Sequence, residues 1–274
     1  MPAQPLYSAQ HQQSAFALRY SWTGWITQGD IHGLPNEAWT ELITAWETDG
    51  LRLFDRLIRD SEIHLTFSGI PSVTPILVAA RAKGRLQYAL RMAGAPVTFS
   101  RKVSIRTVGN NTTPAIEGYI RAQVRNEDFI DPRFAEFLEQ FTIINPRADL
   151  RQPAETNSGR YWYNLHLVLV TEGRHRIIDG PGLRTIRDGA FKIAEKKEYA
   201  IGAISVMPDH VHLALRGNLE HSPEQIALAF QNNLAYMLNR GAVWRRGFYV
   251  GTFGEYDMRA IRKAGRVNCS AVTL

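Results

Sequence analysis

Two histidines in the second half of the chain have the spacing expected of a metal-binding pair. His210 and His212 lie in the segment VMPDHVHLAL, whose apolar residues predict a β-strand. Residues two apart on a strand point to the same face, so the two imidazoles lie side by side and Val211 faces the core. Imidazoles in this arrangement can bind one metal ion. The alternative is a half-exposed strand whose histidines bind no ligand.

The strand that carries the histidine pair belongs to an internal repeat. The segment EIHLTF, which begins at Glu62, aligns with HVHLAL, which begins at His210. Placing Thr-Val-Gly at 107–109 on Thr-Phe-Gly at 252–254 gives an offset of 145 residues between the copies. The repeat therefore covers nearly the whole chain. Each copy reads as strand, helix, strand, helix, one or more strands, and helix.

Apolar spacing predicts the main elements of each copy. Strand-like alternation opens both copies, and helical spacing follows twice in each. The second helix of each copy begins with a Thr or Ser N-cap. The opening strands are expected at 16–27 and 161–171, the first helices at 36–58 and 181–199, and the second helices at 74–94 and 222–241.

These patterns predict an α+β fold made of two repeated domains. Each domain is expected to be an antiparallel β-sheet with helices on one face. The polar segment 145–160 contains two prolines and no apolar periodicity, and it is therefore predicted to be a linker. It separates a first domain, residues 1–144, from a second domain, residues 161–274.

The composition limits the classes of function. The chain is 45% hydrophobic and 21% charged, as in an ordinary globular protein, and its net charge of +6 modestly favours a polyanionic partner such as nucleic acid. Its single cysteine, Cys269, excludes an internal disulfide and a cysteine-rich zinc site. The N-terminal segment lacks the layout of a signal peptide, and no run of about 20 apolar residues is present. We therefore expect a cytoplasmic protein without membrane contact.

Several features of the second half resemble the single-tyrosine HUH transposases of minimal insertion sequences and their repeat-associated relatives. These features are the His-hydrophobic-His strand after Met-Pro-Asp, His166 in the opening strand, and the block WRRGFYVGTFGE at 244–255. The resemblance implies a ferredoxin- or RRM-like nuclease fold. It also implies a divalent metal, Mg²⁺ or Mn²⁺, and a single-stranded DNA substrate that forms a hairpin.

The resemblance also implies a tyrosine nucleophile on a helix near the C-terminus, followed four residues later by a glutamine that completes the metal site. In the second half the offset places Ala264 and Asn268 at these two positions. The first half instead carries Tyr119 and Gln123, four residues apart on one helix face. The second half therefore lacks a nucleophile that the first half retains.

The first half has the opposite defect, because Glu62 and His64 occupy the positions of His210 and His212. Family members are homodimers whose active sites form in trans, so a fused pair would bring Tyr119 to the intact histidine pair within one chain. We therefore expect one composite active site in a pseudo-dimer, which leaves association of two chains open. The alternatives are that Tyr119 is simply packed on an amphipathic helix and that His64 is structural or a relic.

Single-stranded DNA binding calls for cations along a backbone track and aromatic faces for base stacking. The candidates are basic residues in the last strand of each copy with a neighbouring tryptophan. The alternative is that these residues bind no nucleic acid and form a solvated charged edge beside aromatic residues of the core. A structural role is preferred for His166. The DNA-binding candidates are Arg101, Lys102, Arg106, Arg245, Arg246 and Trp244.

The leading functional hypothesis is a metal-dependent endonuclease and transposase that cleaves and rejoins single-stranded DNA through a 5′-phosphotyrosine link. With one composite site, a single chain handles one covalent intermediate at a time. A second hypothesis is a domesticated DNA-hairpin-binding protein that has lost catalysis. A third is an HUH nickase of the replication or relaxase type, although the chain has no room for the helicase or primase segments that usually accompany it.

Overall fold

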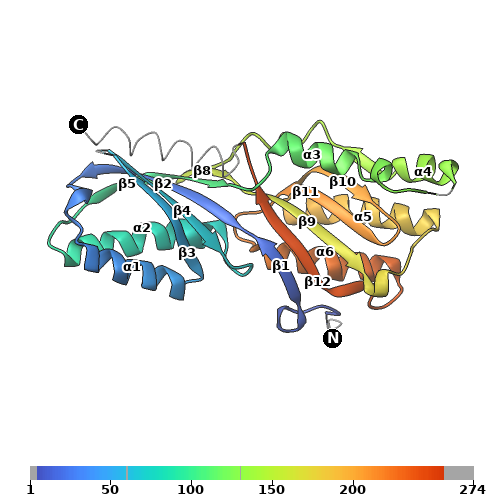
Figure 1. Ribbon diagram of the computed structural model, residues 1–274, viewed down its shortest axis with the longest axis horizontal. Helices are drawn as coiled ribbons and strands as arrows, with labels where there is room; N and C mark the ends of the chain where they lie inside the picture. The colour runs from blue at the N-terminus through green and yellow to red at the C-terminus, as the bar shows by residue number, and fades with distance from the viewer. Residues whose placement is uncertain (1–4, 60, 130, 256–274) are drawn as a thin grey trace.

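The computed structural model describes residues 5–59, 61–129 and 131–255, which form two six-stranded sheets in two neighbouring lobes (Figure 1). The first sheet consists, in spatial order, of β3 (Leu51–Ile58), β4 (Glu62–Gly69), β2 (Arg19–Gln28), β5 (Thr98–Thr107), β8 (Gly159–Trp162) and β7 (Ala154–Thr156). The second sheet consists of β1 (Gln13–Ala17), β12 (Trp244–Phe253), β9 (Asn164–Thr171), β11 (His210–Arg216), β10 (Ala200–Val206) and β6 (Thr142–Ile144).

Each lobe is built on four strands and two helices in the order strand, helix, strand, strand, helix, strand. The four strands are β2 to β5 in the first lobe and β9 to β12 in the second, and each set is antiparallel. This is the ferredoxin-like arrangement, so the predicted α+β fold class is confirmed. The helices are α1 (Asn36–Thr48) and α2 (Pro75–Met92) in the first lobe, and α5 (Gly180–Lys197) and α6 (Pro223–Leu238) in the second.

The second helix of each lobe begins at the predicted N-cap. The Thr74 hydroxyl accepts a hydrogen bond from the Leu77 N–H at 3.1 Å. Ser222 and Gln225 form a reciprocal capping box, in which each side chain accepts from the other residue's backbone N–H. These bonds satisfy N–H groups that have no partner within the first helical turn.

The prediction that each copy opens with one long strand is wrong, because each predicted strand is divided between the two sheets. The run 16–27 is interrupted at Leu18 and the run 161–171 at Tyr163, and the pieces on either side belong to different sheets. β1 pairs in parallel with β12, and β8 pairs in parallel with β5. Each lobe therefore contributes a short strand to the sheet of the other, as the crossing of β1 toward β12 shows in Figure 1.

The first predicted helix, 36–58, was too long. It ends at Thr48, and a turn at Asp49 and Gly50 leads into β3. Gly50 has a φ of 78°, which favours glycine and stops the helix. The corresponding strand of the second lobe, β10, directly follows α5 and was also not predicted. Both strands follow helices with little polar sequence between them, so apolar spacing alone did not separate the two elements.

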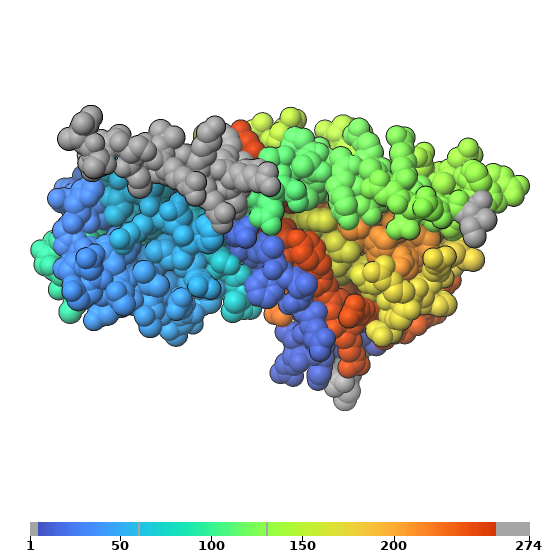
Figure 2. Space-filling view, viewed as in Figure 1, coloured from blue at the N-terminus to red at the C-terminus, as the bar shows by residue number. Residues whose placement is uncertain are grey.

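The segment that follows β5 leaves the first lobe and covers the second. It contains α3 (Thr113–Arg121), α4 (Pro132–Glu139) and β6, and β6 pairs with β10. Figure 2 shows this green segment lying along the yellow and orange second lobe. The second sheet is thus covered on both faces, by α5 and α6 on one side and by α3 on the other. The predicted linker, 145–160, contains β7 and the first residues of β8.

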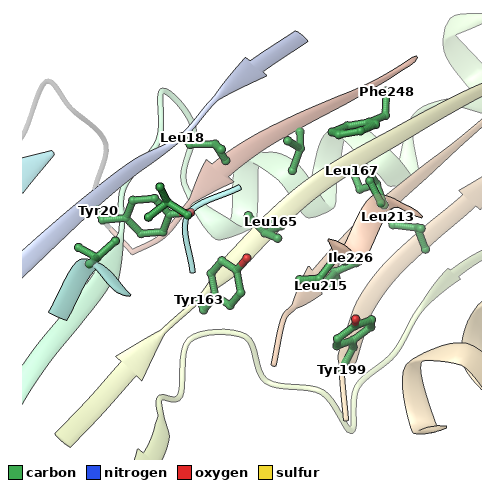
Figure 3. Close-up of a cluster of buried hydrophobic side chains, with 14 of the residues drawn as sticks. Leu18, Tyr20, Tyr163, Leu165, Leu167, Tyr199, Leu213, Leu215, Ile226 and Phe248 are labelled. Carbon is green, nitrogen blue, oxygen red and sulfur yellow. The ribbon is translucent and has the colours of Figure 1, made fainter. Parts of the chain in front are cut away.

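The hydrophobic core is continuous between the lobes. Tyr20 of β2 and Tyr163, at the crossing point before β9, are buried with ring centroids 6.4 Å apart. Leu165 and Leu167 of β9 continue the same core toward β11 (Figure 3). None of the described helices is long and apolar enough to cross a lipid bilayer.

Candidate active site

The histidine pair lies on the face of the second sheet that α3 covers. His210 and His212 project from β11 with ring centroids 4.9 Å apart and planes at 88°. Val211, between them, is buried in the core on the opposite face, as predicted. The alternation of the strand therefore places both imidazoles on the same surface.

A separate hydrogen-bond partner orients each imidazole. Nδ1 of His210 donates to Oδ1 of Asp209 at 2.7 Å, and Nδ1 of His212 lies 3.0 Å from Nε2 of His166. Asp209 also accepts from Arg174 at 2.9 Å. Burial raises the pKa of Asp209, but the hydrogen bonds from Arg174 and His210 outweigh it and hold the pKa below its usual value. Asp209 is therefore a carboxylate that fixes His210.

His166 belongs to this group, although the sequence favoured a structural role for it. Its ring stacks against that of His212 at 5.3 Å and 19°. Burial lowers the pKa of His166 to about 4, and burial together with the neighbouring His166 and His210 lowers the pKa of His212 further. Both rings are therefore neutral near neutral pH. Strand alternation gave the face of His166, but it could not reveal that β9 lies next to β11.

Tyr119 reaches the histidines from the first half of the chain. Its ring centroid lies 5.4 Å from that of His212 and 5.9 Å from that of His166. Ile116 and Ile120, on the buried side of α3, pack against the second sheet and hold the helix there. The Tyr119 side chain itself is 45% exposed, so it is not a core residue. Within the described residues its hydroxyl makes no hydrogen bond.

Gln123 lies just beyond the end of α3 and is buried. Its side-chain Nε2 donates to the backbone carbonyl of Tyr119 at 3.1 Å. Among the described residues no hydrogen bond joins Gln123 to His210 or His212. The structure thus brings Tyr119 and the histidines together and places Gln123 one helical turn away from Tyr119.

The donor atoms around the histidine pair fit a divalent metal ion. Asp209 and His166 occupy the Nδ1 side of His210 and His212, so a proton on each Nδ1 leaves each Nε2 with a free lone pair. No hydrogen bond in the described part of the chain uses either Nε2. Residues 5–59, 61–129 and 131–255 contain no cluster of three His, Cys, Asp or Glu side chains suited to a metal. A metal held here would need another kind of ligand, such as the Gln123 amide, water or a phosphate oxygen.

Tyr249 of β12 forms the other wall of the site. Its ring centroid lies 5.8 Å from that of His166, and the side chain is 38% exposed. Burial raises the pKa of Tyr249, the charge of Arg19 opposes that shift, and Tyr119 adds to it. A Cβ at Gly251 would lie 2.5 Å from the Tyr249 hydroxyl oxygen, so the glycine leaves room for this ring.

The equivalent position in the first sheet has different chemistry. Oε1 of Glu62 is 3.1 Å from Nε2 of His64 and 2.9 Å from the Arg59 guanidinium. The hydrogen bond from His64 is the main reason that the pKa of Glu62 is lowered. Nδ1 of His64 lies 2.9 Å from the Thr23 hydroxyl. Both ligand positions are therefore engaged by protein groups. Ala264 and Asn268 lie outside the described residues.

The structure separates the predicted DNA-binding residues. Lys102 and Arg106 lie on the outer face of the first sheet. Arg101 instead lies near Lys83 of α2, whose pKa is lowered first by burial and then by the charge of Arg101. Arg245 and Arg246 are exposed. Trp244 is 1% exposed and belongs to the core, so it has no free face for base stacking.

Comparison with known proteins finds similarity in the second half of the chain. Residues 160–263 match the family model described as "Transposase IS200 like". A candidate transposase from Deinococcus radiodurans R1 is 24% identical, with a TM-score of 0.32, and the match covers 38% of this chain and 88% of that one. A REP-associated tyrosine transposase bound to a REP hairpin is 12% identical, with a TM-score of 0.31, and the match covers 37% of this chain and 61% of that one. None of the curated proteins compared with the chain matches it.

Proposed function

We propose that this chain, whose residues 160–263 form an IS200-like transposase domain, cuts and rejoins single-stranded DNA at one composite active site. The observation that carries the proposal is the position of Tyr119. A helix from the first half places this tyrosine 5.4 Å, between ring centroids, from His212 in the second half. The half that supplies the tyrosine has Glu62 in place of one histidine, and the half that supplies the histidines has Ala264 in place of the tyrosine.

In the proposed reaction the Tyr119 oxygen attacks a backbone phosphorus of the DNA. A bond forms between that oxygen and phosphorus while the bond from phosphorus to the 3′ oxygen breaks. The phenol loses its proton and the 3′ oxygen gains one, which leaves a 5′-phosphotyrosine link and a free 3′-hydroxyl. The reverse attack by a 3′-hydroxyl rejoins the strand, so the cycle needs no ATP.

The chain's own residues prepare this step in three ways. The exposed face of α3 presents Tyr119 to the solvent side of the histidines, where a DNA strand can enter. His210 and His212 would hold Mg²⁺ or Mn²⁺, with Gln123 as the third expected ligand. The bound ion would neutralise charge on the phosphate oxygens during attack. Asp209 and His166 keep the two imidazoles in the orientation that this requires.

Covalent trapping tests the proposal directly. The purified chain is incubated with Mn²⁺ and a library of single-stranded hairpins labelled at the 3′ end, because the downstream fragment stays on the protein through its 5′ phosphate. We expect a labelled protein band on a denaturing gel. The band disappears in Tyr119→Phe and His210→Ala and persists in the matched control His64→Ala.

Two other outcomes would overturn the proposal. Hairpins that bind without any adduct would favour a DNA-binding protein that has lost catalysis. An adduct that persists in Tyr119→Phe would assign the nucleophile to another residue, of which Tyr249, near His166, is the first to test.

A further inference from the structure

We infer that the outer face of the first sheet is a second binding site for single-stranded DNA, which holds the strand without cutting it. This inference rests on the proposed function for the identity of the ligand. The site is a groove of about 610 Å³ that lies where the first lobe would have had its own active site. We call it the Trp25 groove; its charged and aromatic lining consists of Trp25, Lys102, Arg106, Arg160 and Trp162 together with Glu62, whose carboxylate is hydrogen-bonded to His64.

Both lobes contribute to the Trp25 groove. The exchanged strand β8 pairs with β5 so that Arg160 lies opposite Ser104 and Trp162 opposite Arg106. The outer positions of β5 are polar, and Lys102 and Arg106 both reach the groove. Strand exchange therefore places a row of cations from two parts of the chain along one surface. A track of this kind suits the phosphate backbone of a single strand.

Two tryptophans give the groove surfaces for base stacking. Trp25 is 37% exposed, so part of this residue is accessible to a ligand. Trp162 has the Arg106 guanidinium 3.7 Å above its ring centroid. Aromatic faces next to cations bind unpaired bases with little regard to sequence. The groove thus carries both features of a single-strand binding surface.

Existing ion pairs leave the cations accessible to a phosphate. Arg106 pairs with Glu255 at 3.2 Å and Arg160 with Glu155 at 3.0 Å, and all four side chains are at least 38% exposed. Exposed pairs of this kind contribute little to stability, so a phosphate can compete for the guanidinium groups. Lys102 forms no ion pair with any described residue.

The charge of the Trp25 groove is not a general property of the repeat. At the offset of 145 residues the counterparts of Lys102 and Arg106 are glycines, and those of Arg160 and Trp162 are alanines. These counterparts lie beside the proposed active site on the second sheet. The cations and the indole ring are therefore present only where the metal-binding pair has been lost. The four counterparts are Gly247, Gly251, Ala15 and Ala17.

The groove is also poorly suited to an amphipathic helix. On the second sheet, small apolar residues such as Ala203 and Ala214 receive Ile116 and Ile120 of α3. The lining of the Trp25 groove is instead dominated by hydroxyl and charged side chains. In the sequence, the counterpart of Ile120 in the C-terminal segment is Gly265. Polarity therefore favours a polyanion over a second copy of the α3 contact.

A binding experiment with cleavage blocked tests the inference. In a Tyr119→Phe background, the quenching of tryptophan fluorescence is titrated with an oligothymidine of about 12 nucleotides. We expect Trp25→Ala and Lys102→Ser each to raise the Kd about tenfold. Lys102→Ser should also lower the slope of log Kd against log salt concentration by about one. The matched control Arg133→Ser removes an exposed cation on α4 and leaves the Kd unchanged.

The outcomes separate this inference from the proposed function. If hairpins form the Tyr119 adduct but the groove variants bind oligothymidine as tightly as Arg133→Ser does, the second site is wrong and the proposed function stands. If no adduct forms in any hairpin but the groove variants lose binding, the groove stands without the nuclease. If quenching is absent and a Trp25→Cys variant forms a disulfide with Cys269, the groove belongs to the C-terminal segment of this chain instead.

Discussion

Thr107 and Thr252 make the same hydrogen bonds with the two halves of the chain exchanged. The Thr107 hydroxyl accepts from the Asn164 N–H at 3.0 Å and donates to the Phe253 carbonyl at 2.7 Å. Both partners lie in the second half. A buried hydroxyl that both accepts and donates in this way joins the last strand of the first lobe to two strands of the second.

The Thr252 hydroxyl repeats the pattern in the opposite direction. It accepts from the Arg19 N–H at 2.9 Å and donates to the Val108 carbonyl at 2.6 Å. Each of these partners is 145 residues from its counterpart around Thr107. The two threonines therefore lie about an approximate twofold axis between the lobes. This arrangement of the lobes places α3 over the histidine pair.

We expect Thr107→Val and Thr252→Val to destabilise the chain by similar amounts. Each substitution keeps the volume but leaves buried backbone groups without a partner, which costs about 1 to 3 kcal/mol. Urea unfolding measures the loss. The matched control is Thr27→Val, which removes an exposed hydrogen bond to Thr98 at 3.0 Å and should cost less than about 0.5 kcal/mol. Equal, small effects of all three substitutions would contradict a structural role for the threonine pair.

The same symmetry explains which parts of the fold were predictable. The repeat and its offset followed from short matches such as Thr107 with Thr252, because local sequence carries that information. The change of sheet at Leu18 and Tyr163 could not be predicted, because an alternating run looks the same whether its two ends pair in one sheet or in two. Only long-range pairing decides that question.

The candidate site was likewise predictable only in part. The residue types and spacing of His210, His212 and Tyr119 were readable from the sequence. Their proximity to His166 and Tyr249 depends on the order of the strands, which no local pattern gives. The burial of Trp244 was missed for a related reason, since an aromatic next to two arginines reads equally well as a surface or a core residue.

A composite site within one chain predicts that two inactive variants do not complement each other when they are mixed. Tyr119→Phe and His210→Ala are each expected to lose adduct formation. A mixture of the two should remain inactive, because α3 is already docked on the second sheet of its own chain through Ile116 and Ile120. The measurement is adduct yield in the mixture relative to wild type at equal total protein. Recovery to about a quarter of the wild-type yield, as random pairing of subunits would give, would show that sites form between chains.

The buried histidines predict a loss of stability at low pH in the absence of metal. Burial lowers the pKa of His166 and His212 in the folded chain, while their unfolded values lie near the usual 6.5. The unfolded state therefore binds more protons below about pH 6.5, so stability is full above that pH and falls as the pH drops below it. We expect a loss of roughly 1 to 2 kcal/mol for each histidine between about pH 7 and pH 5.

Urea unfolding in a chelating buffer at the two pH values measures this loss. The comparison that isolates the histidines is His166→Gln, since carboxylates such as Asp209 contribute to the pH dependence of both proteins. The variant should take up about one proton fewer on unfolding than the wild type between these pH values. Identical pH dependence in the two proteins would mean that His166 titrates alike in the folded and unfolded states, as an exposed imidazole does.

Asp209 is expected to tune metal binding without taking part in the chemistry. Asp209→Asn keeps the shape of the side chain but removes the carboxylate that accepts from His210 Nδ1 at 2.7 Å. Loss of such an orienting partner typically weakens metal affinity about 10- to 100-fold. The Mn²⁺ concentration for half-maximal adduct should rise by that factor, with the yield restored at saturating Mn²⁺. Arg174→Gln removes the other partner of Asp209 but leaves its bond to His210, so its half-maximal Mn²⁺ should change much less. A lower yield of Asp209→Asn that saturating Mn²⁺ does not restore would instead place the carboxylate among the groups that act on the DNA itself.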